Sequence, residues 1–129
     1  MTKMNSNGKP FTFTIQRSRW LRGTGFGLLL DSTGKQCCVG HYLSALGVKS
    51  ERLFMVSCAQ WVKDRLDAAN WLVIAHERGS VQSKEANELY YANDRRITKD
   101  EPRLKKERER EQRIKQLFAQ QNIRVRFTP

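Results

Sequence analysis

Two segments near the ends of the chain alternate apolar and polar residues at every second position. Residues 11–15 read Phe-Thr-Phe-Thr-Ile, and residues 123–127 read Ile-Arg-Val-Arg-Phe. This repeat is typical of a strand with one buried and one exposed face, so both segments are predicted to be half-buried strands. If the two strands are neighbours, their apolar side chains form one buried face. The exposed face then carries Arg124, Arg126, Thr12, Thr14 and Gln16.

Between these strands the pattern predicts a series of short elements. The apolar runs 27–30 and 36–39 flank the turn-forming residues 31–35, which indicates a β-hairpin. Gly40 is expected to end the hairpin, and Gly47 to end a short helix over residues 41–46. The other predicted elements are an amphipathic helix over 57–69, a central strand over 71–75, a loop over 77–82 and a helix that Ser83 caps and that buries Ala86, Leu89 and Tyr90.

The last predicted helix runs from about residue 100 to 121 and is highly charged. Its first half is apolar only at Leu104, so only the second half is expected to pack against a core. Asp100 is the preferred N-cap, with Pro102 in the first turn. Thr98 and Glu101 also match a capping box, but that register puts Pro102 where a backbone N–H is needed.

Together these elements predict an α+β fold in a single domain over residues 11–129, preceded by a flexible segment at residues 1–10. The sheet is expected to be small and mostly antiparallel, with helices packed on one face. The long charged C-terminal helix leads into the final strand. A chain of 129 residues with 39% hydrophobic content is sufficient for one modest core.

The charge of the chain is unevenly placed. The sequence has 24 Lys and Arg against 13 Asp and Glu, a formal net charge of +11. Residues 1–50 carry 7 basic and 1 acidic side chains, residues 51–94 carry 5 and 7, and residues 95–129 carry 12 and 5. If the two basic ends meet in the fold, their field is expected to attract nucleic acid, an anionic membrane surface or an acidic protein.

Basic residues in three segments are therefore the candidate contacts. On the C-terminal helix they recur at spacings of three, four and three, which places them in one stripe. A second group lies in the run 17–22 around Trp20, and a third on the final strand. The candidates for contact with nucleic acid or a protein partner are Arg17, Arg19, Arg22, Arg103, Lys106, Arg110, Arg113, Arg124 and Arg126.

Each group also has an interpretation without a ligand. The helix stripe is equally consistent with a solvated helix held by pairs such as Glu109 with Arg113 and Glu111 with Lys115. Trp20 could stack on a base, but a core position is more common for tryptophan.

Residues suited to metal binding or catalysis are few. Cys38 and His41 have a possible ligand spacing, with Cys37, Cys58 and His76 elsewhere in the chain. Because adjacent strand residues point to opposite faces, Cys37 and Cys38 are not expected to reach one ion, and buried packing is the preferred interpretation. We therefore predict no metal, no cofactor and no enzymatic activity.

The compartment follows from the cysteines and the apolar runs. Three cysteines, two of them adjacent, argue against a disulfide framework and favour a reducing cytoplasm. The longest apolar runs are too short for a membrane-spanning helix, so no membrane association is predicted. The oligomeric state is left open.

Several stretches resemble small uncharacterised proteins of tailed phages and prophages. They are Trp20-Leu21-Arg22-Gly23, Gly34-Lys35-Gln36-Cys37-Cys38-Val39-Gly40 and Asn122-Ile123-Arg124-Val125-Arg126-Phe127, with Tyr42-Leu43, Gly47, Asn93-Asp94 and Leu117-Phe118 between them. The resemblance covers about half of the chain. It implies an accessory role in host takeover or counter-defence in the bacterial host cytosol, and it implies no activity for any residue.

The sequence thus predicts a non-enzymatic protein that binds nucleic acid or a nucleoprotein complex through a basic surface. The alternative is a protein–protein inhibitor that acts on an acidic surface of a host or bacterial-defence complex. A small enzyme or zinc module, resting on Cys38, His41 and His76, is a third hypothesis.

Overall fold

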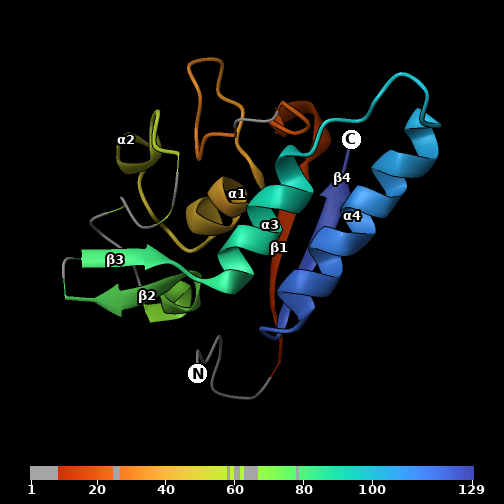
Figure 1. Cartoon of the computed structure of the whole chain (residues 1–129). Helices are drawn as coiled ribbons and strands as arrows, with labels where there is room; N and C mark the ends of the chain where they lie inside the picture. The colour runs from red at the N-terminus through yellow and green to blue at the C-terminus, as the bar shows by residue number, and fades with distance from the viewer. Residues whose placement is uncertain (1–8, 25–26, 58, 60–61, 63–66, 78) are drawn as a thin grey trace.

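The computed structural model describes residues 9–24, 27–57, 59, 62, 67–77 and 79–129, so most of the predicted flexible segment 1–10 lies outside the described residues. The chain combines helices and strands (Figure 1). In chain order the elements are β1 (Phe11–Gln16), the 3-10 helix η1 (Arg17–Arg19), α1 (Cys38–Ala45), α2 (Ser50–Leu53), the 3-10 helix η3 (Asp67–Leu72), β2 (Val73–His76), β3 (Gly79–Gln82), α3 (Lys84–Asp94), α4 (Arg103–Ala119) and β4 (Ile123–Thr128).

The two strands with alternating apolar residues do lie side by side. β1 pairs with β4 in a two-stranded sheet, with Phe11 opposite Ile123 and Gln16 opposite Thr128. The pairing is parallel, so the expectation of an antiparallel sheet is wrong for this pair. A tight turn after α4 reverses the chain, with Asn122 at a positive φ of 59°, and β4 therefore runs back along α4 in the direction of β1 (Figure 1).

One face of this sheet is buried under helices. α1 covers β1 and α4 covers β4, as the alternation predicts for the apolar positions. Tyr42 of α1 is the centre of the core, because its ring lies 5.4 Å from that of Phe13 and 5.3 Å from that of Phe118, centroid to centroid. Its hydroxyl donates to the carbonyl of Ala68 at 2.7 Å, so this buried polar group is satisfied.

The predicted hairpin over residues 27–39 is wrong apart from its turn. The Asp31 carboxylate accepts from the backbone N–H groups of Thr33 and Lys35, both at 2.9 Å. Two backbone hydrogen bonds join the arms of the loop, from Asp31 to Lys35 and from Cys37 to Leu28, but neither arm forms a strand. α1 begins at Cys38, and Gly40 lies inside the helix instead of ending a strand. The reason is tertiary packing: a Cβ at Gly40 would overlap the carbonyl of Leu29, so the helix packs directly against this backbone.

The antiparallel part of the prediction holds for a second, separate pair of strands. β2 pairs with β3 from Val73 opposite Gln82 to His76 opposite Gly79. The predicted central strand over 71–75 is therefore one half of a two-stranded ribbon, and the predicted loop over 77–82 contains the other half. The sequence of β3 has little apolar content to signal a strand. The helix predicted over 57–69 falls largely outside the described residues, and residues 67–72 form η3.

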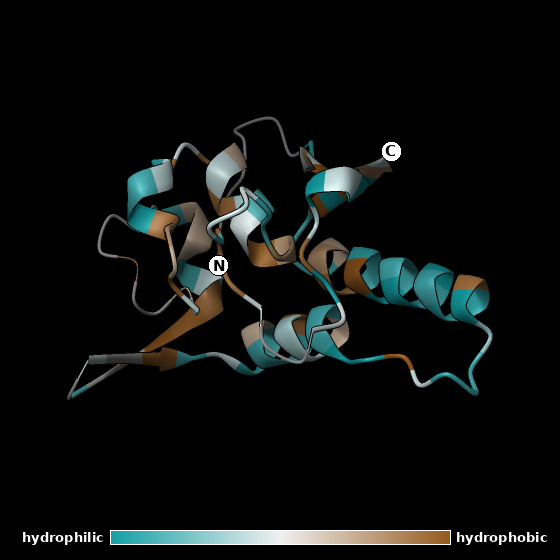
Figure 2. Ribbon diagram, turned by 90° about the horizontal axis from the view of Figure 1, so that it is seen from above, coloured by the Kyte–Doolittle hydropathy of each residue, from teal (hydrophilic) through white to brown (hydrophobic). Residues whose placement is uncertain are grey.

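The two longer helices agree better with the predictions. Ser83 caps α3 by accepting from the backbone N–H of Ala86 at 3.0 Å, as predicted. α4 packs through its second half, whereas Leu104 in its first half is 71% exposed. Figure 2 shows α4 as mostly hydrophilic. The Asp100 cap is wrong, because α4 begins at Arg103 and its preceding residue makes no side-chain cap.

The last turn of α3 joins two other parts of the fold through Asn93, which is fully buried. Its side-chain oxygen accepts from the indole N–H of Trp20 at 2.7 Å and from the backbone N–H of Cys38 at 2.9 Å. Its side-chain nitrogen donates to the carbonyl of Leu21 at 2.9 Å, and its own carbonyl accepts from the N–H of Gly23 at 2.9 Å. One amide group thus holds segment 20–23, the start of α1 and the end of α3 together.

We expect Asn93→Ala to lower the free energy of unfolding by about 3 kcal/mol or more, because it leaves buried donors and an acceptor without partners. Asn87→Ala is the matched control, since Asn87 lies on the same helix and is exposed; its effect is expected to stay within about 0.5 kcal/mol. Urea unfolding followed by tryptophan fluorescence measures both. Equal effects of the two substitutions would show that the Asn93 network does not stabilise the fold.

Candidate nucleic-acid interface

The nine predicted contact residues occupy three kinds of environment. The first is represented by Arg110, which is buried. Its guanidinium donates to the carbonyls of Ala92, Asn93 and Arg95 at 3.1, 2.7 and 2.6 Å, the last carbonyls of α3. A cation at the C-terminus of a helix stabilises the unpaired carbonyls and the negative end of the dipole. Arg110 therefore has a structural role and is not available to a phosphate.

Arg17 and Arg22 use their charge inside the molecule. Arg17 makes a bidentate pair with Glu111 at 2.7 and 2.8 Å, and Arg22 pairs with Glu107 at 2.7 Å. The Arg22 guanidinium also lies over the ring of Trp20, 4.4 Å from its centroid. Because Trp20 is buried in the core, stacking of this ring on a base is not available. These pairs fasten segment 17–22 to α4.

The ion pairs of Glu107 with Arg22 and Arg110 lower the pKa of its carboxyl group. Burial alone would raise the pKa of this carboxyl, but the hydrogen bonds and charges of Arg22 and Arg110 outweigh it and hold the pKa below its usual 4.5. Glu107 thus stays ionised at neutral pH between two arginines.

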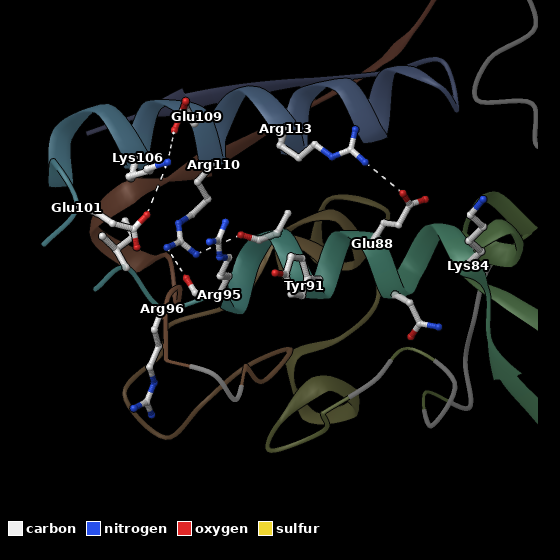
Figure 3. A pocket seen from close by; sticks show the side chains of 13 residues that line it. Lys84, Glu88, Tyr91, Arg95, Arg96, Glu101, Lys106, Glu109, Arg110 and Arg113 are labelled. Atoms are coloured by element: carbon white, nitrogen blue, oxygen red, sulfur yellow. Dashed lines mark hydrogen bonds and ion pairs between the residues drawn. The ribbon is translucent and has the colours of Figure 1, made fainter. Parts of the chain in front are cut away.

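Lys106 and Arg113 face α3 across a groove and are also paired (Figure 3). The Lys106 ammonium lies 3.6 Å from Glu101 and 3.3 Å from Glu109. Arg113 reaches Glu88 on α3 at 3.1 Å, so the predicted pair of Arg113 with Glu109 is not the one formed. The helix stripe therefore faces a neighbouring helix and is largely neutralised there.

The remaining four predicted residues are exposed, and within the described part of the chain their side chains make no ion pair. They are Arg19, Arg103, Arg124 and Arg126. Arg19 lies in η1 just after β1, and Arg103 is the first residue of α4. Arg124 and Arg126 are two positions apart on β4, so their side chains leave the same face of the sheet.

That sheet face is the most uniform charged surface among the predicted sites. Register places Thr12 beside Arg124 and Thr14 beside Arg126. The exposed positions of both strands carry no carboxylate, in contrast to α4, where each paired cation has one nearby. The face combines two guanidinium groups with adjacent hydroxyls, all of which are donors suited to phosphate oxygens.

Sequence reasoning missed the residues that α3 contributes to the groove. Lys84, Glu88, Tyr91 and Arg95 line it together with the α4 stripe. Their spacings of four, three and four were a readable helical signal. The sequence analysis considered only the apolar positions of this helix, which predict its buried face, and not the polar positions on the other faces.

The cysteine and histidine residues that are described have packing roles. Cys37 and Cys38 are fully buried, and burial raises the pKa of Cys37 to about 12 and that of Cys38 well above its usual value. Both thiols thus stay protonated and unreactive at neutral pH. Among the described residues no cluster of three or more metal-ligating side chains occurs. Cys58 and the side chain of His76 lie outside the described residues.

Comparison with protein-family models, with curated proteins and with solved structures finds no match for this chain. Within the described residues, none of the helices combines the length and the apolar character needed to cross a membrane.

We expect Arg110→Met to lower the free energy of unfolding by about 3 kcal/mol, because the carbonyls at the end of α3 lose their charged donor. Arg113→Met is the matched control on the same helix. Its pair with Glu88 is exposed, and we expect it to cost less than about 0.5 kcal/mol. Denaturant unfolding compares them, and equal losses would contradict the capping role of Arg110.

His41 predicts a pH dependence of stability. Burial lowers its pKa below 6.5, although the hydrogen bond between its Nδ1 and the Cys37 carbonyl opposes this. As the pH falls through 6.5, the unfolded chain takes up the proton before the folded chain does, so stability decreases with falling pH. We expect a loss of up to about 1.4 kcal/mol per pH unit from this group.

The measurement is the free energy of unfolding between about pH 7.5 and 5.5. His41→Asn retains a hydrogen-bond donor near Nδ1 and should flatten the dependence. His76→Gln removes the other histidine of the chain and serves as the control. An unchanged slope in His41→Asn would contradict the assignment to His41.

Proposed function

We propose that this protein binds nucleic acid, alone or within a nucleoprotein complex, through the exposed face of the β1–β4 sheet and without catalysing a reaction. The observation that carries the proposal is the pair Arg124 and Arg126, which are exposed, lie on one strand and have no ion-pair partner within the described residues. Thr12 and Thr14 lie beside them in register. We call these four residues the sheet-face site.

The geometry suits a backbone of regularly spaced phosphates. Residues two apart on a strand are separated by roughly 6.6 Å along its axis, so neighbouring phosphates can be contacted by Arg124 and Arg126 in turn. Guanidinium groups bind phosphate with two parallel hydrogen bonds, and the threonine hydroxyls add shorter contacts. Phosphate contacts of this kind position nucleic acid and carry no sequence information.

The same face has no element that reads bases. Its exposed positions on the two strands are Thr, Gln and Arg, with no aromatic side chain on which a base could stack. The proposal therefore includes no preference for sequence. It predicts an affinity that depends steeply on salt, because binding releases counterions from the phosphates.

The resemblance of several stretches to small tailed-phage proteins extends the proposal. On that basis the protein would be a phage accessory protein acting in the cytoplasm of a bacterial host, in host takeover or counter-defence. Supporting this extension needs a cellular experiment, whereas the sheet-face site can be tested with purified protein.

We expect binding to mixed-sequence duplex DNA, single-stranded DNA and RNA to weaken linearly in the logarithm of the salt concentration. The double variant Arg124→Glu with Arg126→Glu should bind more weakly at low salt, and its salt slope should be smaller by about 2, corresponding to the two lost phosphate contacts. Fluorescence anisotropy of labelled oligonucleotides measures both quantities.

The matched control is Lys105→Glu with Arg108→Glu on the exposed side of α4. It lowers the net charge of +11 by the same amount, because both variants replace two cations by two carboxylates. If both variants lose the same affinity, general charge and not the sheet-face site governs binding. If the unsubstituted protein binds none of the three nucleic acids even at low salt, the proposal is wrong, and an acidic protein surface becomes the preferred partner.

A further inference from the structure

A groove of about 630 Å³ lies between α3 and α4, and Arg95, Arg96, Ile97 and Glu101 of the segment that connects them also line it (Figure 3). It lies on the helix-covered side of the β1–β4 sheet, whereas the sheet-face site occupies the opposite, uncovered side (Figure 1). The two surfaces can therefore be occupied independently. A volume of this size accommodates several side chains of a peptide or one small molecule.

The apolar part of the groove centres on Tyr91, whose side chain is 67% exposed although tyrosine is mostly found partly buried. Ala92 and Ile97, both half-buried, continue this apolar surface. Burial of an aromatic ring supplies much of the free energy in many protein interfaces, where tyrosine and arginine are enriched. An exposed tyrosine between arginines is thus a typical anchor position for a partner.

The charged part of the groove is mixed, with an excess of cations. Its lining has six cationic side chains, those of Lys84, Arg95, Arg96, Lys106, Arg110 and Arg113. Three carboxylates oppose them, those of Glu88, Glu101 and Glu109. Within the described residues the side chain of Lys84 makes neither a hydrogen bond nor an ion pair. Arg95 makes no hydrogen bond or ion pair through its side chain either, and it interacts with Glu101 only electrostatically, so both cations can bind an incoming anionic group.

We propose that this groove binds a short acidic segment of a protein partner. An apolar side chain of the segment packs against Tyr91 and Ile97, and its carboxylates pair with Lys84 and Arg95. This inference goes beyond nucleic-acid binding, because it assigns a second surface to a second class of partner.

The carboxylates in the walls favour a polypeptide over a nucleic acid. The amide N–H groups of a polypeptide can donate hydrogen bonds to the carboxylates of Glu88, Glu101 and Glu109, whereas a phosphate backbone has no donor to offer them. The apolar surface around Tyr91 also fits a side chain of a peptide. The excess of cations selects acidic segments and disfavours basic ones.

One ion pair across the groove can exchange on binding. Arg113 and Glu88 join α4 to α3 at 3.1 Å, and both side chains are exposed. Exposed pairs of this type contribute little free energy, so a carboxylate of the partner can replace Glu88 at low cost. Arg110 takes no part in this exchange, because it is committed to the carbonyls of α3.

The test is a selection from a displayed library of random peptides of about 12 residues, using the complete chain as bait. The expected result is enrichment of peptides with net negative charge and at least one large apolar residue. Synthetic copies of these peptides should bind the double variant Tyr91→Ala with Arg95→Glu at least about tenfold more weakly, as measured by fluorescence anisotropy. Both side chains are exposed, so the variant is expected to fold, and far-ultraviolet circular dichroism with thermal unfolding checks this.

Two controls separate this proposal from the sheet-face site. Lys105→Glu with Arg108→Glu lies outside the groove lining and should leave peptide binding within about twofold of the unsubstituted protein. Arg124→Glu with Arg126→Glu should also leave peptide binding unchanged while it weakens nucleic-acid binding. A variant that loses peptide binding but keeps its oligonucleotide affinity tests the groove, and a variant that loses oligonucleotide affinity but keeps peptide binding tests the sheet-face site.

Three results would overturn the proposal. In the first, the selection enriches no peptides or only neutral and basic ones. In the second, the enriched acidic peptides bind the groove variant as tightly as the unsubstituted protein. In the third, no peptide binds and the groove variant loses oligonucleotide binding. The last result would make the groove part of the nucleic-acid site.

Discussion

The interaction on which this fold depends is the convergence of Asn93 and Arg110 at the end of α3. The carbonyl of Asn93 accepts from the Arg110 guanidinium at 2.7 Å and from the N–H of Gly23 at 2.9 Å. Its amide group reaches Trp20 and the first turn of α1 at Cys38. A buried network of this kind is stable only when every member is satisfied, and it then specifies one arrangement of the segments it joins. The end of α3 thus fixes where segment 20–23 crosses, and with it the path of the chain out of β1.

This constraint determines which charges remain for a ligand. Because segment 17–22 lies against α4, Arg17 pairs with Glu111 and Arg22 pairs with Glu107. These four charged side chains therefore bind each other and not a ligand. Three cations of the α4 stripe are also paired: Arg113 with Glu88 on α3, Lys106 with Glu101 and Glu109, and Arg110 with Glu107 and the carbonyls at the end of α3. The exposed positions of β4 face away from all of these groups. Among the described residues no carboxylate pairs with Arg124, so its guanidinium can contact solvent or a ligand. A net charge of +11 therefore says less about binding than the distribution of the carboxylates does.

Local patterns predicted some of the local structure, although the hairpin over 27–39, the Asp100 cap and the loop over 77–82 were wrong. The alternation in β1 and β4 follows from the geometry of a single strand, and the Ser83 cap involves groups only three residues apart. Both can therefore be predicted without knowledge of the rest of the fold. The parallel direction of β4 and the inclusion of Gly40 in a helix depend on packing between distant segments, which no short window contains. The hub at Asn93 was missed for the same reason. The partners of its side-chain amide at Trp20, Leu21 and Cys38 lie 55 to 73 residues away in the chain.

In the candidate site, too, local patterns predicted some features, and others depended on packing between distant segments. Periodicity identified Arg124 and Arg126 as neighbours on one exposed face, which they were expected to share with Thr12 and Thr14 if the strands are adjacent. The parallel register that pairs Thr12 with Arg124 and Thr14 with Arg126 was not predicted. Periodicity also grouped Arg110 with the α4 stripe, but it cannot tell whether a stripe faces solvent or another helix. The fold makes that distinction: Arg110 caps α3, Arg113 pairs with Glu88 across the groove, Lys106 pairs with Glu101 and Glu109, and Arg103 stays exposed. An arginine in a basic chain is therefore a candidate contact only when the fold leaves it without a carboxylate. Among the described residues, the sheet face, the Lys84–Arg95 side of the groove, Arg19 and Arg103 meet this criterion.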